Sequence, residues 1–412
     1  MTGMDSLVVV VFVLTYVGMA LGRVPGLKLD RTGIALLATV ALLAFGGVEV
    51  GDAGAAVDMP TLLLLFALMI VSSQLQSAGV FQVVAMRVAA APGSADRLLL
   101  VTVLAAGFAS AALANDIVVF AMTPVLAEGV RRRGLDPRPF LLGLAGGANA
   151  GSAMTIIGNP QNILIGQVGG LDFWHFLLAC AVPGLAALGI VWLTVRRVWR
   201  AELTATPEPV PDAPPFRAEP WQAGKGIVAL VFLLALFATD LPREVGALAV
   251  AALLLMSRRL ASRDMIGAVD WHLLLLFACL FVITDSFANT GLAARGVELM
   301  AETGLLPDRV SVMAPVALLA SNTVGNVPAT MLILSVWPIA DAGPLYGLAV
   351  LSTLAGNLLL VGSLANIIVA ERAAAAGVPL SFTDFARAGV PMTLASMAVA
   401  MAWLWAVGWM AW

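Results

Sequence analysis

The chain has 412 residues, of which 61% are hydrophobic and 11% are charged, and its mean hydropathy is +0.98. Such values lie far outside the range of soluble proteins, so the chain is an integral membrane protein. Its net charge of −3 says little about partners, and Cys180 and Cys279 lie in separate apolar runs without a CxxC or Cys/His cluster. We therefore expect no disulfide framework, no metal site, no cofactor and no nucleic-acid partner.

Apolar segments separated by charged ones predict the helices that span the membrane, because a helix needs about 20 apolar residues to cross the hydrocarbon core. The first half of the chain contains such segments at 5–22, 32–48, 59–77, 98–128, 140–168 and 174–195. The second half contains them at 226–241, 244–257, 271–288, 310–340, 345–370 and 389–411. The first segment has no basic N-terminal region and no cleavage site, so we interpret it as a retained helix.

A proline-rich stretch separates the two halves. Residues 204–220, TATPEPVPDAPPFRAEP, contain few apolar residues, and this composition is typical of an extended linker. We therefore assign 1–200 and 226–412 to two structural halves and 201–225 to a linker between them.

The two halves resemble each other segment by segment. TLLLLFALMIVSSQLQSAGV matches HLLLLFACLFVITDSFANTGL, so that Gly79 falls on Gly291, and IGNPQNILI (157–165) matches VGSLANIIV (361–369). NDIVVFAMTPVL (115–126) likewise matches NVPATMLILSVW (326–337), which places Asn115 opposite Asn326. Because the order of the matches is preserved, we predict that the halves are repeats of one module.

The distribution of Lys and Arg, which concentrate on the cytoplasmic side of membrane proteins, indicates the orientation. If segments 98–128 and 310–340 do not cross the membrane, only Arg243, Arg295 and Arg309 lie outside. If both segments crossed it, the arginines on either side of the first would fall on opposite faces. We therefore predict that neither segment crosses.

Both of these segments are predicted to be re-entrant hairpins, which turn near LAND (113–116) and SNTVGN (321–326). Each half then has five spanning helices and one hairpin, and an odd number of crossings inverts the second half relative to the first. The predicted fold is an all-α polytopic membrane protein with two inverted-topology repeats. Both termini are expected outside, and the 201–225 linker is expected in the cytoplasm.

The apolar segment 140–168 is interrupted near its middle by GNPQN, where unpaired backbone groups are costly unless they have partners. Pro160 disfavours helix in the preceding residue, and Asn162 is expected to cap the helix that restarts. The matching segment 345–370 is interrupted by GSLAN. We predict two helices broken at the middle of the membrane, whose backbone dipoles face a solute.

The predicted solute site combines these breaks with the hairpin tips. Its candidate residues are Asn115, Asp116, Asn149, Gly158, Asn159, Pro160, Asn162, Ser321, Asn322, Thr323, Asn326, Thr330, Gly362, Ser363 and Asn366. No Lys or Arg is expected at either tip or break. An anion is therefore expected to be held by amides, hydroxyls and helix N-termini, together with a transient bound sodium ion.

Two carboxylates are candidates for coupling transport to an ion gradient, because ionisable groups within the membrane are functional candidates by default. Asp116 lies at a hairpin tip, where we expect it to bind a cation, carry a proton or hold neighbouring asparagines. Asp285 lies late in a spanning segment, opposite Ser73 of the first half.

At these residues the chain resembles the ion transporter superfamily, which contains arsenite permeases, sodium/proton antiporters of the NhaD type, citrate–metal symporters and divalent-anion/sodium symporters. LANDIVVFAMTPVL is similar to the arsenite-permease hairpin. NAGSAMTIIGNPQNILI, GNVPAT and GSLANIIV are similar to companion motifs, especially those of the YbiR-type permeases. The resemblance covers nearly the whole chain.

The resemblance implies a homodimer in which a transport domain slides across the membrane against a scaffold, as an elevator. On this chain the transport domain and its connecting arms are expected at roughly 59–186 and 271–395. The first two spans of each half are expected to form most of the scaffold.

We therefore expect a secondary-active transporter in the inner membrane that moves a small inorganic anion or a metalloid oxyanion such as arsenite or antimonite. The coupling ion is expected to be a proton or sodium. Alternatives are a sodium/proton antiporter and a sodium-coupled di- or tricarboxylate symporter. Dicarboxylate symporters have Ser-Asn-Thr at both tips, whereas this chain has Ala114-Asn115-Asp116 at the first, which favours the arsenite-permease branch.

A channel is disfavoured because alternating access explains why two inverted copies are nearly equivalent. An enzyme is disfavoured because the sequence contains no HExxH or GxSxG motif. A cytoplasmic ATPase subunit is compatible with the assignment as an additional partner.

Overall fold

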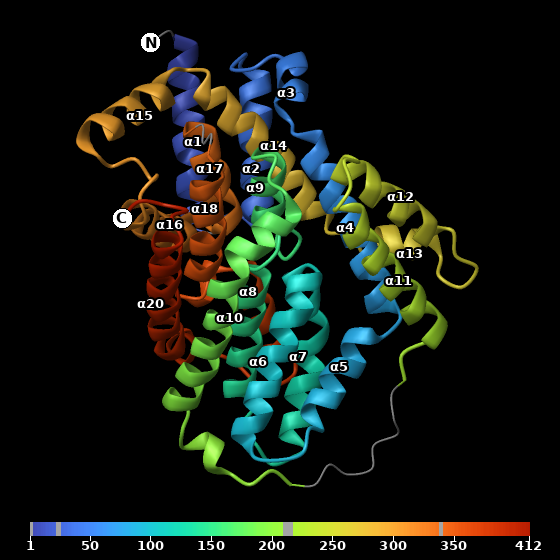
Figure 1. Cartoon of the computed structure of the whole chain (residues 1–412). Helices are drawn as coiled ribbons and strands as arrows, with labels where there is room; N and C mark the ends of the chain where they lie inside the picture. The colour runs from blue at the N-terminus through green and yellow to red at the C-terminus, as the bar shows by residue number, and fades with distance from the viewer. Residues whose placement is uncertain (1–2, 22–25, 209–216, 338–340) are drawn as a thin grey trace.

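The structure, a computed structural model, describes residues 3–21, 26–208, 217–337 and 341–412. Over these residues the secondary structure is helical, apart from one isolated β-bridge between Arg309 and Ala411. The predicted all-α class is therefore confirmed (Figure 1).

The helices fall into two series, one in each half of the chain (Figure 1). The first series is α1 (Gly3–Leu21), α2 (Arg31–Ala44), α3 (Val50–Ala56), α4 (Met59–Ser77), α5 (Val80–Ala89), α6 (Ala95–Ala112), α7 (Asn115–Arg131), α8 (Arg138–Ser152), α9 (Pro160–Val168) and α10 (Phe173–Val198). The second series is α11 (Pro220–Leu236), α12 (Arg243–Leu255), α13 (Ser262–Gly267), α14 (Trp271–Ala288), α15 (Leu292–Thr303), α16 (Val310–Val324), α17 (Asn326–Val336), α18 (Ala342–Ala355), α19 (Leu364–Ala375) and α20 (Phe382–Ala406). Two short 3-10 turns, η1 (Glu202–Thr204) and η2 (Leu360–Gly362), complete the described secondary structure.

The two series correspond helix by helix, as the sequence repeats predict. Gly79 and Gly291, which the sequences align, both precede the fifth helix of their series in the left-handed conformation, with φ of 78° and 74°. In each series the sixth and seventh helices form a hairpin, and the eighth and ninth form one broken helix. The α6–α7 hairpin lies in the lower half of the view and the α16–α17 hairpin in the upper half (Figure 1). The inverted-repeat fold is thus confirmed.

The boundaries differ from the sequence prediction in several places. Four short helices, α3, α5, α13 and α15, lie between the predicted spans, and the hydropathy pattern missed them because they are too short to give a span signal. α11 begins at Pro220, inside the predicted linker, and α20 begins earlier than the predicted 389. Parts of the predicted linker and second hairpin, 209–216 and 338–340, lie outside the described residues.

Six helices of the described part of the chain are long and apolar enough to cross a membrane, namely α1, α4, α6, α10, α14 and α20. α6 forms one arm of the first hairpin, while the two broken helices, α8–α9 and α18–α19, are each made of shorter pieces. Helices long enough to span the membrane therefore occur in both halves of the chain, as expected of a multi-pass membrane protein.

The first arms of the two broken helices form the centre of the bundle. Every residue of α8 from Pro139 to Ser152 is buried, and so is every residue of α18 from Leu345 to Ala355. α8 packs against α6 through glycines: a Cβ at Gly151 would lie 2.0 Å from the carbonyl oxygen of Gly107. Backbones this close are typical of small-residue packing between membrane helices.

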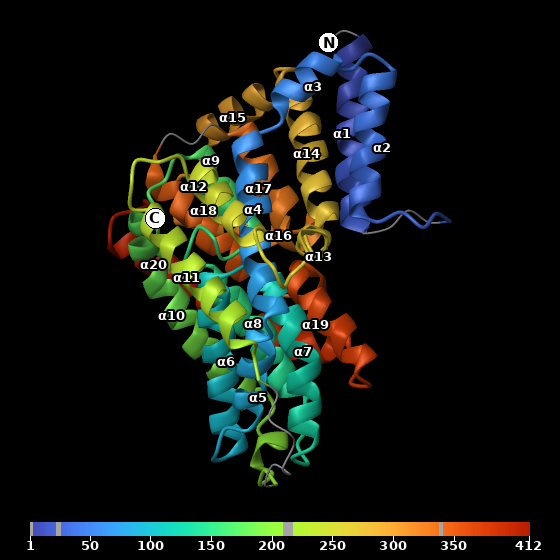
Figure 2. The ribbon, with the colours of Figure 1, turned by 90° about the vertical axis from the view of Figure 1, so that its right-hand side faces the viewer.

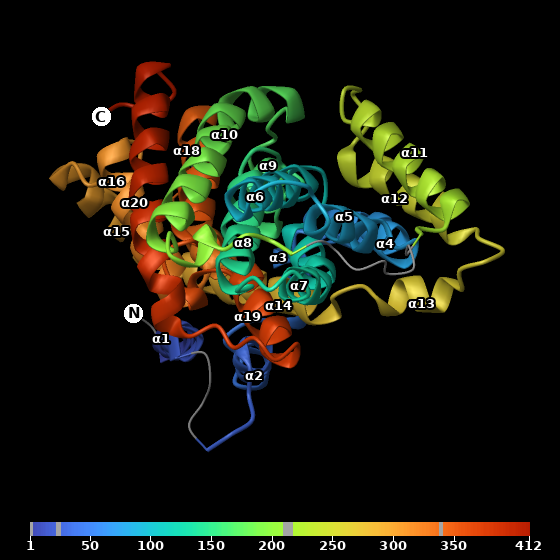
Figure 3. The same cartoon turned by 90° about the horizontal axis from the view of Figure 1, so that it is seen from below.

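The pairs α1–α2 and α11–α12 lie at two separate edges of the bundle, as the view along it shows (Figure 3). The turned view shows α1 and α2 beside α14, with the α6–α7 hairpin at the opposite end of the molecule (Figure 2). These edge pairs are the segments that the family resemblance assigns to the scaffold. The central hairpins and broken helices are the segments that it assigns to the moving domain.

Candidate functional site

The first broken helix is interrupted over residues 153–159, between α8 and α9. Asn159 adopts an extended backbone, and its Oδ1 accepts a hydrogen bond of 2.8 Å from the Asn162 backbone N–H. Pro160 occupies the first helical position, where its missing N–H costs nothing. The prediction that Asn162 caps α9 is therefore wrong. Asn159 is the cap, because Asn162 already lies inside the first turn of α9.

The side chain of Asn162 instead points back to the break that precedes it. Its Nδ2 donates to the carbonyl oxygens of Ser152 and Thr155, at 3.1 and 3.0 Å. These carbonyls belong to the end of α8 and to the unwound segment, where no helical partner follows. Asn162 therefore satisfies the carbonyl groups that the break exposes.

The second broken helix has the same construction. Asn366 Nδ2 donates to the carbonyl oxygens of Gly356 and Leu359, at 2.8 and 3.2 Å. Like Asn162, it bonds the carbonyls ten and seven residues earlier in the chain. Ser363 stands at the start of α19, and its hydroxyl donates to Asn149 Oδ1 rather than capping the helix.

The two breaks are joined across the repeats by buried side chains. Asn149 in α8 donates from Nδ2 to Asn357 Oδ1 at 2.8 Å and to Asn366 Oδ1 at 2.9 Å. Thr353 in α18 makes the reverse contact, accepting from Asn159 Nδ2 at 3.2 Å and donating to Asn162 Oδ1 at 3.4 Å.

The two bridging residues hold equivalent places in the repeats. Asn149 precedes Asn162 by thirteen residues, and Thr353 precedes Asn366 by thirteen. The bridge therefore obeys the internal symmetry of the chain. Asn149 was predicted as a site residue, whereas Thr353 and Asn357 were not. Alignment of the repeats through Asn162 and Asn366 places Thr353 opposite Asn149.

The first hairpin turns between α6 and α7 and is tied to the first break. The Asn115 backbone N–H donates to the Gly158 carbonyl oxygen at 3.0 Å, and its side-chain Nδ2 donates to Asn149 Oδ1 at 3.2 Å. The second hairpin turns at Gly325, whose φ of +98° strongly favours glycine. Asn326 follows as the first residue of α17, opposite Asn115 in the repeat alignment.

Both tip asparagines carry a buried oxygen that lacks a partner. Asn115 Oδ1 and Asn326 Oδ1 accept no hydrogen bond from any residue that the structure describes. A buried acceptor without a partner is costly, so such atoms indicate a place where a ligand donates or an ion binds. The two atoms come from equivalent positions of opposite repeats.

Ser321, Asn322 and Thr323 lie in the last turns of α16 and not at the tip. Ser321 Oγ donates to the Ser352 carbonyl at 3.4 Å, and Asn322 Nδ2 donates to the Ala355 carbonyl at 2.9 Å. These two side chains therefore attach the hairpin to α18, whereas Thr323 is exposed.

A cavity of about 580 Å³ lies between the hairpin tips, the breaks and the starts of α2 and α14. Some of the remaining candidates line this cavity and others do not. Candidate residues that line it are Asn115, Asp116, Pro160, Asn326, Gly362 and Ser363. Thr330 is buried away from this lining, with no partner for its hydroxyl among the described residues. Asp285 also lies outside the lining, in the last turn of α14, where Asn289 Nδ2 donates to it at 3.0 Å.

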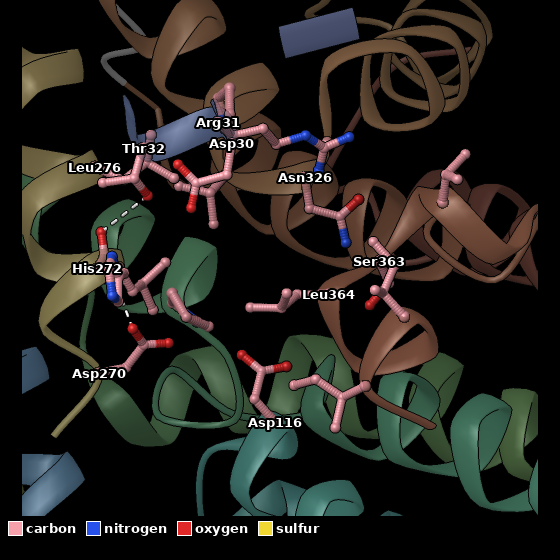
Figure 4. Close-up of a pocket in the computed structure, with 18 of the residues that line it drawn as sticks. Asp30, Arg31, Thr32, Asp116, Asp270, His272, Leu276, Asn326, Ser363 and Leu364 are labelled. Carbon is pink, nitrogen blue, oxygen red and sulfur yellow. Dashed lines mark hydrogen bonds between the residues drawn. The ribbon is translucent and has the colours of Figure 1, made fainter. Parts of the chain in front are cut away.

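Asp116 points from α7 into the cavity, while Asn326 and Ser363 lie on the opposite wall (Figure 4). No described residue forms a hydrogen bond or ion pair with the Asp116 carboxylate. The other cavity aspartates near it have structural roles: Asp30 caps α2 through the Gly33 N–H, and Asp270 caps α14 through the Leu273 N–H. Asp116 is thus the aspartate of this lining that has no structural partner among the described residues, and it remains available for a proton or a cation.

Arg31, at the start of α2, brings a positive charge to the second hairpin tip. A Cβ at Gly325 would lie 3.0 Å from Arg31 Nη1, and Arg31 Nε donates to the Met19 carbonyl at 3.3 Å. No carboxylate of the described residues lies within 4.0 Å of the guanidinium. The expectation that no Lys or Arg reaches a tip is therefore wrong.

Arg31 was not predicted to lie in the site, because the distribution of Lys and Arg assigns it to a cytoplasmic loop. The chain folds so that the start of α2 faces the hairpin tip, and this contact joins segments almost 300 residues apart. Gln161 and His272, which line the same cavity, were not predicted as site residues either.

The chain is similar to known proteins over most of its length. The sequence profile of the citrate transporter family matches residues 10–343. A "46 kDa membrane protein" of Mycobacterium leprae is 30% identical over 429 aligned positions, which cover 98% of each chain. The silicon efflux transporter LSI3 of rice (Oryza sativa subsp. japonica) is 29% identical over 449 positions, covering 91% of this chain and 92% of LSI3.

A solved structure shares the fold. The crystal structure of the YdaH transporter of Alcanivorax borkumensis, whose topology is described as unusual, superposes with a TM-score of 0.61 and 13% sequence identity. The match covers 98% of this chain and 97% of that one. The resemblance to the ion transporter superfamily is thus confirmed, and this multi-pass membrane protein belongs to the citrate transporter family.

Proposed function

We propose that the protein is a secondary-active transporter of the elevator type whose substrate is a small metalloid hydroxide or oxyanion of the arsenite, antimonite or silicic acid kind. The observation that carries the proposal is the cavity where both hairpin tips meet the second break, whose largely apolar lining contains a few polar side chains. Asn115, Asn326 and Arg31 all line it, and the side-chain oxygens of both asparagines lack a partner among the described residues. Such a wall offers both acceptors and donors to one compact solute.

The chemistry of these solutes fits that combination. Arsenous and silicic acids carry several hydroxyl groups on one small centre, so each molecule donates and accepts hydrogen bonds at once. Their O–H groups would satisfy the tip oxygens, while their oxygens would accept from Arg31 and Gln161. The rice relative is named for silicon efflux, which supports a metalloid substrate.

Asp116 is proposed to couple movement of the solute to an ion gradient. Its carboxylate faces the cavity without a structural partner and lies across from Asp270 (Figure 4). Two carboxylates in one cavity repel each other when both are charged, which favours uptake of a proton or a sodium ion. The tip oxygens of Asn115 and Asn326 are suitable additional ligands for sodium.

A di- or tricarboxylate symporter is the second candidate function. The cationic Arg31 favours it, because a guanidinium binds a carboxylate through two parallel hydrogen bonds. The family is also named for citrate transport. Against it stand the acidic groups Asp30, Asp116, Asp270 and Glu371, which line the same cavity and repel a polyanion unless cations accompany it.

We further propose that the protein forms a homodimer in the inner membrane, with both termini outside. Arg131 ends α7, Arg132 and Arg133 follow it, and Arg196 and Arg197 lie in the last turn of α10. These basic residues gather at the end of the bundle from which the first hairpin enters. That distribution supports a cytoplasmic location for this end.

Transport by the full-length chain in proteoliposomes tests the proposed function. Vesicles with an imposed pH or sodium gradient are supplied in turn with arsenite, silicic acid, citrate or sodium alone, and protein-free vesicles serve as the control. We expect arsenite or silicic acid to move and to dissipate one gradient. Sodium-dependent citrate uptake without metalloid movement would replace the proposal with the second candidate. Collapse of the pH gradient by sodium alone would identify a sodium/proton antiporter.

A further inference from the structure

Two arginines occupy equivalent places at the edge of the transport site. Arg31 is the first residue of α2 and Arg243 is the first residue of α12, so each begins the second helix of its repeat. Both belong to the pairs assigned to the scaffold. Their surroundings differ, although their places in the repeats are the same.

Arg243 is attached to the far end of a broken helix. Its Nη1 donates to the Gly166 carbonyl at 3.1 Å and to Gln167 Oε1 at 3.3 Å, and its Nη2 donates to the Leu171 carbonyl. Gln167 in turn donates from Nε2 to Glu244 Oε2 at 3.1 Å. A cation at the C-terminal end of α9 is stabilised by the unpaired carbonyls and the helix dipole.

Arg31 lies at the N-terminal end of α19, the helix that corresponds to α9 in the other repeat. It contacts the second hairpin tip at Gly325, and it lines the cavity together with Gly362, Ser363 and Leu364, where α19 begins. Only Nε of its guanidinium donates a hydrogen bond to a described residue. Arg243 therefore binds the C-terminal end of α9, whereas Arg31 faces the N-terminal end of α19.

The residue of α19 that corresponds to Gln167 is Glu371. Each follows the asparagine of its break, Asn162 or Asn366, by five residues. Glu371 is exposed, lines the same cavity as Arg31, and forms no ion pair with a described residue. Glu371 of the second repeat, an acidic residue without an ion-pair partner among the described residues, thus lies where the first repeat has Gln167, the partner of Arg243.

In an inverted-repeat transporter the state that faces the other side of the membrane is obtained when the two repeats exchange conformations. We therefore infer that Arg31 and Arg243 bind their broken helices alternately: in the opposite-facing state Arg31 pairs with Glu371 at the end of α19, and Arg243 releases α9. This inference rests on the elevator movement proposed above. It makes both arginines positioning residues of the transport cycle.

The distance to be covered agrees with a sliding movement. From Leu364 to Glu371 is seven residues, or roughly 10 Å along an α-helix at 1.5 Å per residue. A shift of this size brings the end of α19 to the place that its start now occupies. Because one arginine is anchored in each state, the exchange keeps the two states close in free energy, as a reversible cycle needs.

Charge reversal in the full-length chain tests the pairing through the rate of transport in proteoliposomes. We expect Arg31→Glu and Glu371→Arg each to slow exchange of arsenite or silicic acid by roughly tenfold, the size of a typical coupling between sites. The double variant Arg31→Glu/Glu371→Arg is expected to be faster than either single variant, although it stays below the original rate because Arg31 is also proposed to contact the solute. Arg295→Glu, which changes an exposed arginine outside the cavity, is the matched control. A double variant as slow as the single ones would overturn the pairing and leave Arg31 as a substrate ligand alone.

A second measurement needs no transported solute, so its result is independent of the proposed substrate. Cysteine pairs Arg31→Cys/Glu371→Cys and Arg243→Cys/Gln167→Cys are treated in the membrane with a bifunctional thiol reagent about as long as an arginine side chain. We expect each pair to be linked in the chain that carries it alone. In a chain that carries all four introduced cysteines, we expect linkage of one pair to prevent linkage of the other. The inference is wrong if only the Arg243/Gln167 pair reacts, or if both links form in one chain. If only one pair at a time is linked in a chain that transports no metalloid, the alternation of the two arginines is supported and the proposed substrate is wrong.

Discussion

Asn149 Nδ2 donates a hydrogen bond of 2.9 Å to Asn366 Oδ1, and the two asparagines belong to different repeats. Thr353 and Asn162 make the equivalent contact in the reverse direction, at 3.4 Å. Because lipid offers no hydrogen-bonding partner, buried polar side chains of this kind must bond one another. The two broken helices are therefore fixed to each other at the centre of the bundle, and the site depends on this connection.

Removing the central asparagine should destabilise the fold. Asn149→Ala leaves the amides of Asn357 and Asn366 with fewer partners, and we expect the free energy of unfolding to fall by about 1–3 kcal/mol. Denaturant or thermal unfolding in detergent measures the change. Asn289→Ala is the matched control, because that side chain is exposed and, among the described residues, forms a hydrogen bond with Asp285 alone. Equal stability of the two variants would show that the central bridge contributes little.

The second break should not tolerate a side chain at its glycine. A Cβ at Gly362 would lie 2.4 Å from Asn322 Oδ1 and 2.9 Å from the Gly356 carbonyl oxygen. We expect Gly362→Ala to displace the hairpin end, to slow transport and to lower stability by about 1–3 kcal/mol.

The control for this variant is Gly189→Ala in the middle of α10, where the new Cβ meets no atom within 4 Å. That change is expected to be neutral or to stabilise the helix by up to about 1 kcal/mol. Similar behaviour of both variants in an unfolding assay would mean that the break adjusts to the extra atom.

Asp116→Asn should separate coupling from movement. The amide cannot take up or release a proton, so we expect a pH gradient to drive no uptake, while solute exchange at equal pH continues. Both rates are measured in proteoliposomes, beside the exposed-site control Asp308→Asn. Uptake that still follows the pH gradient in Asp116→Asn would remove this carboxylate from the coupling mechanism.

The unpartnered oxygen of the second tip should contribute to solute affinity. Asn326→Leu removes the acceptor and keeps a similar volume, and we expect the half-saturation concentration to rise by roughly tenfold, the equivalent of one hydrogen bond. Thr323→Val is the comparison, because Thr323 is exposed and its hydroxyl donates to the Leu319 carbonyl in its own helix. If the larger effect came from Thr323, the tip assignment would be wrong.

Most of what could be predicted of the fold from the sequence came from aligning the two repeats. Asn115 and Asn326 were placed opposite each other, and both prove to begin the second arm of a hairpin, because the same helix break recurs in two aligned stretches. The roles of single side chains were less accessible. Asn159 rather than Asn162 caps α9, since the direction of each amide depends on which carbonyls the break leaves open.

The cavity was predicted only in part for a similar reason. Its tip and break residues follow from the repeats, whereas Arg31 and Asp270 enter from the starts of α2 and α14. Nothing local in the sequence indicates that these helix starts face a tip, because the contact is made by distant segments. Arg31 is also the residue that most changes the charge of the site.

The central claim is that the cavity at the hairpin tips is the solute site and opens alternately to the two sides of the membrane. Labelling of Leu364→Cys with a membrane-impermeant maleimide tests this directly, because Leu364 is 41% exposed on the cavity wall and both native cysteines are buried. We predict labelling from each side of the membrane in turn, slowed by the transported solute. Labelling from one side alone, unaffected by any solute that the protein transports, would contradict the account.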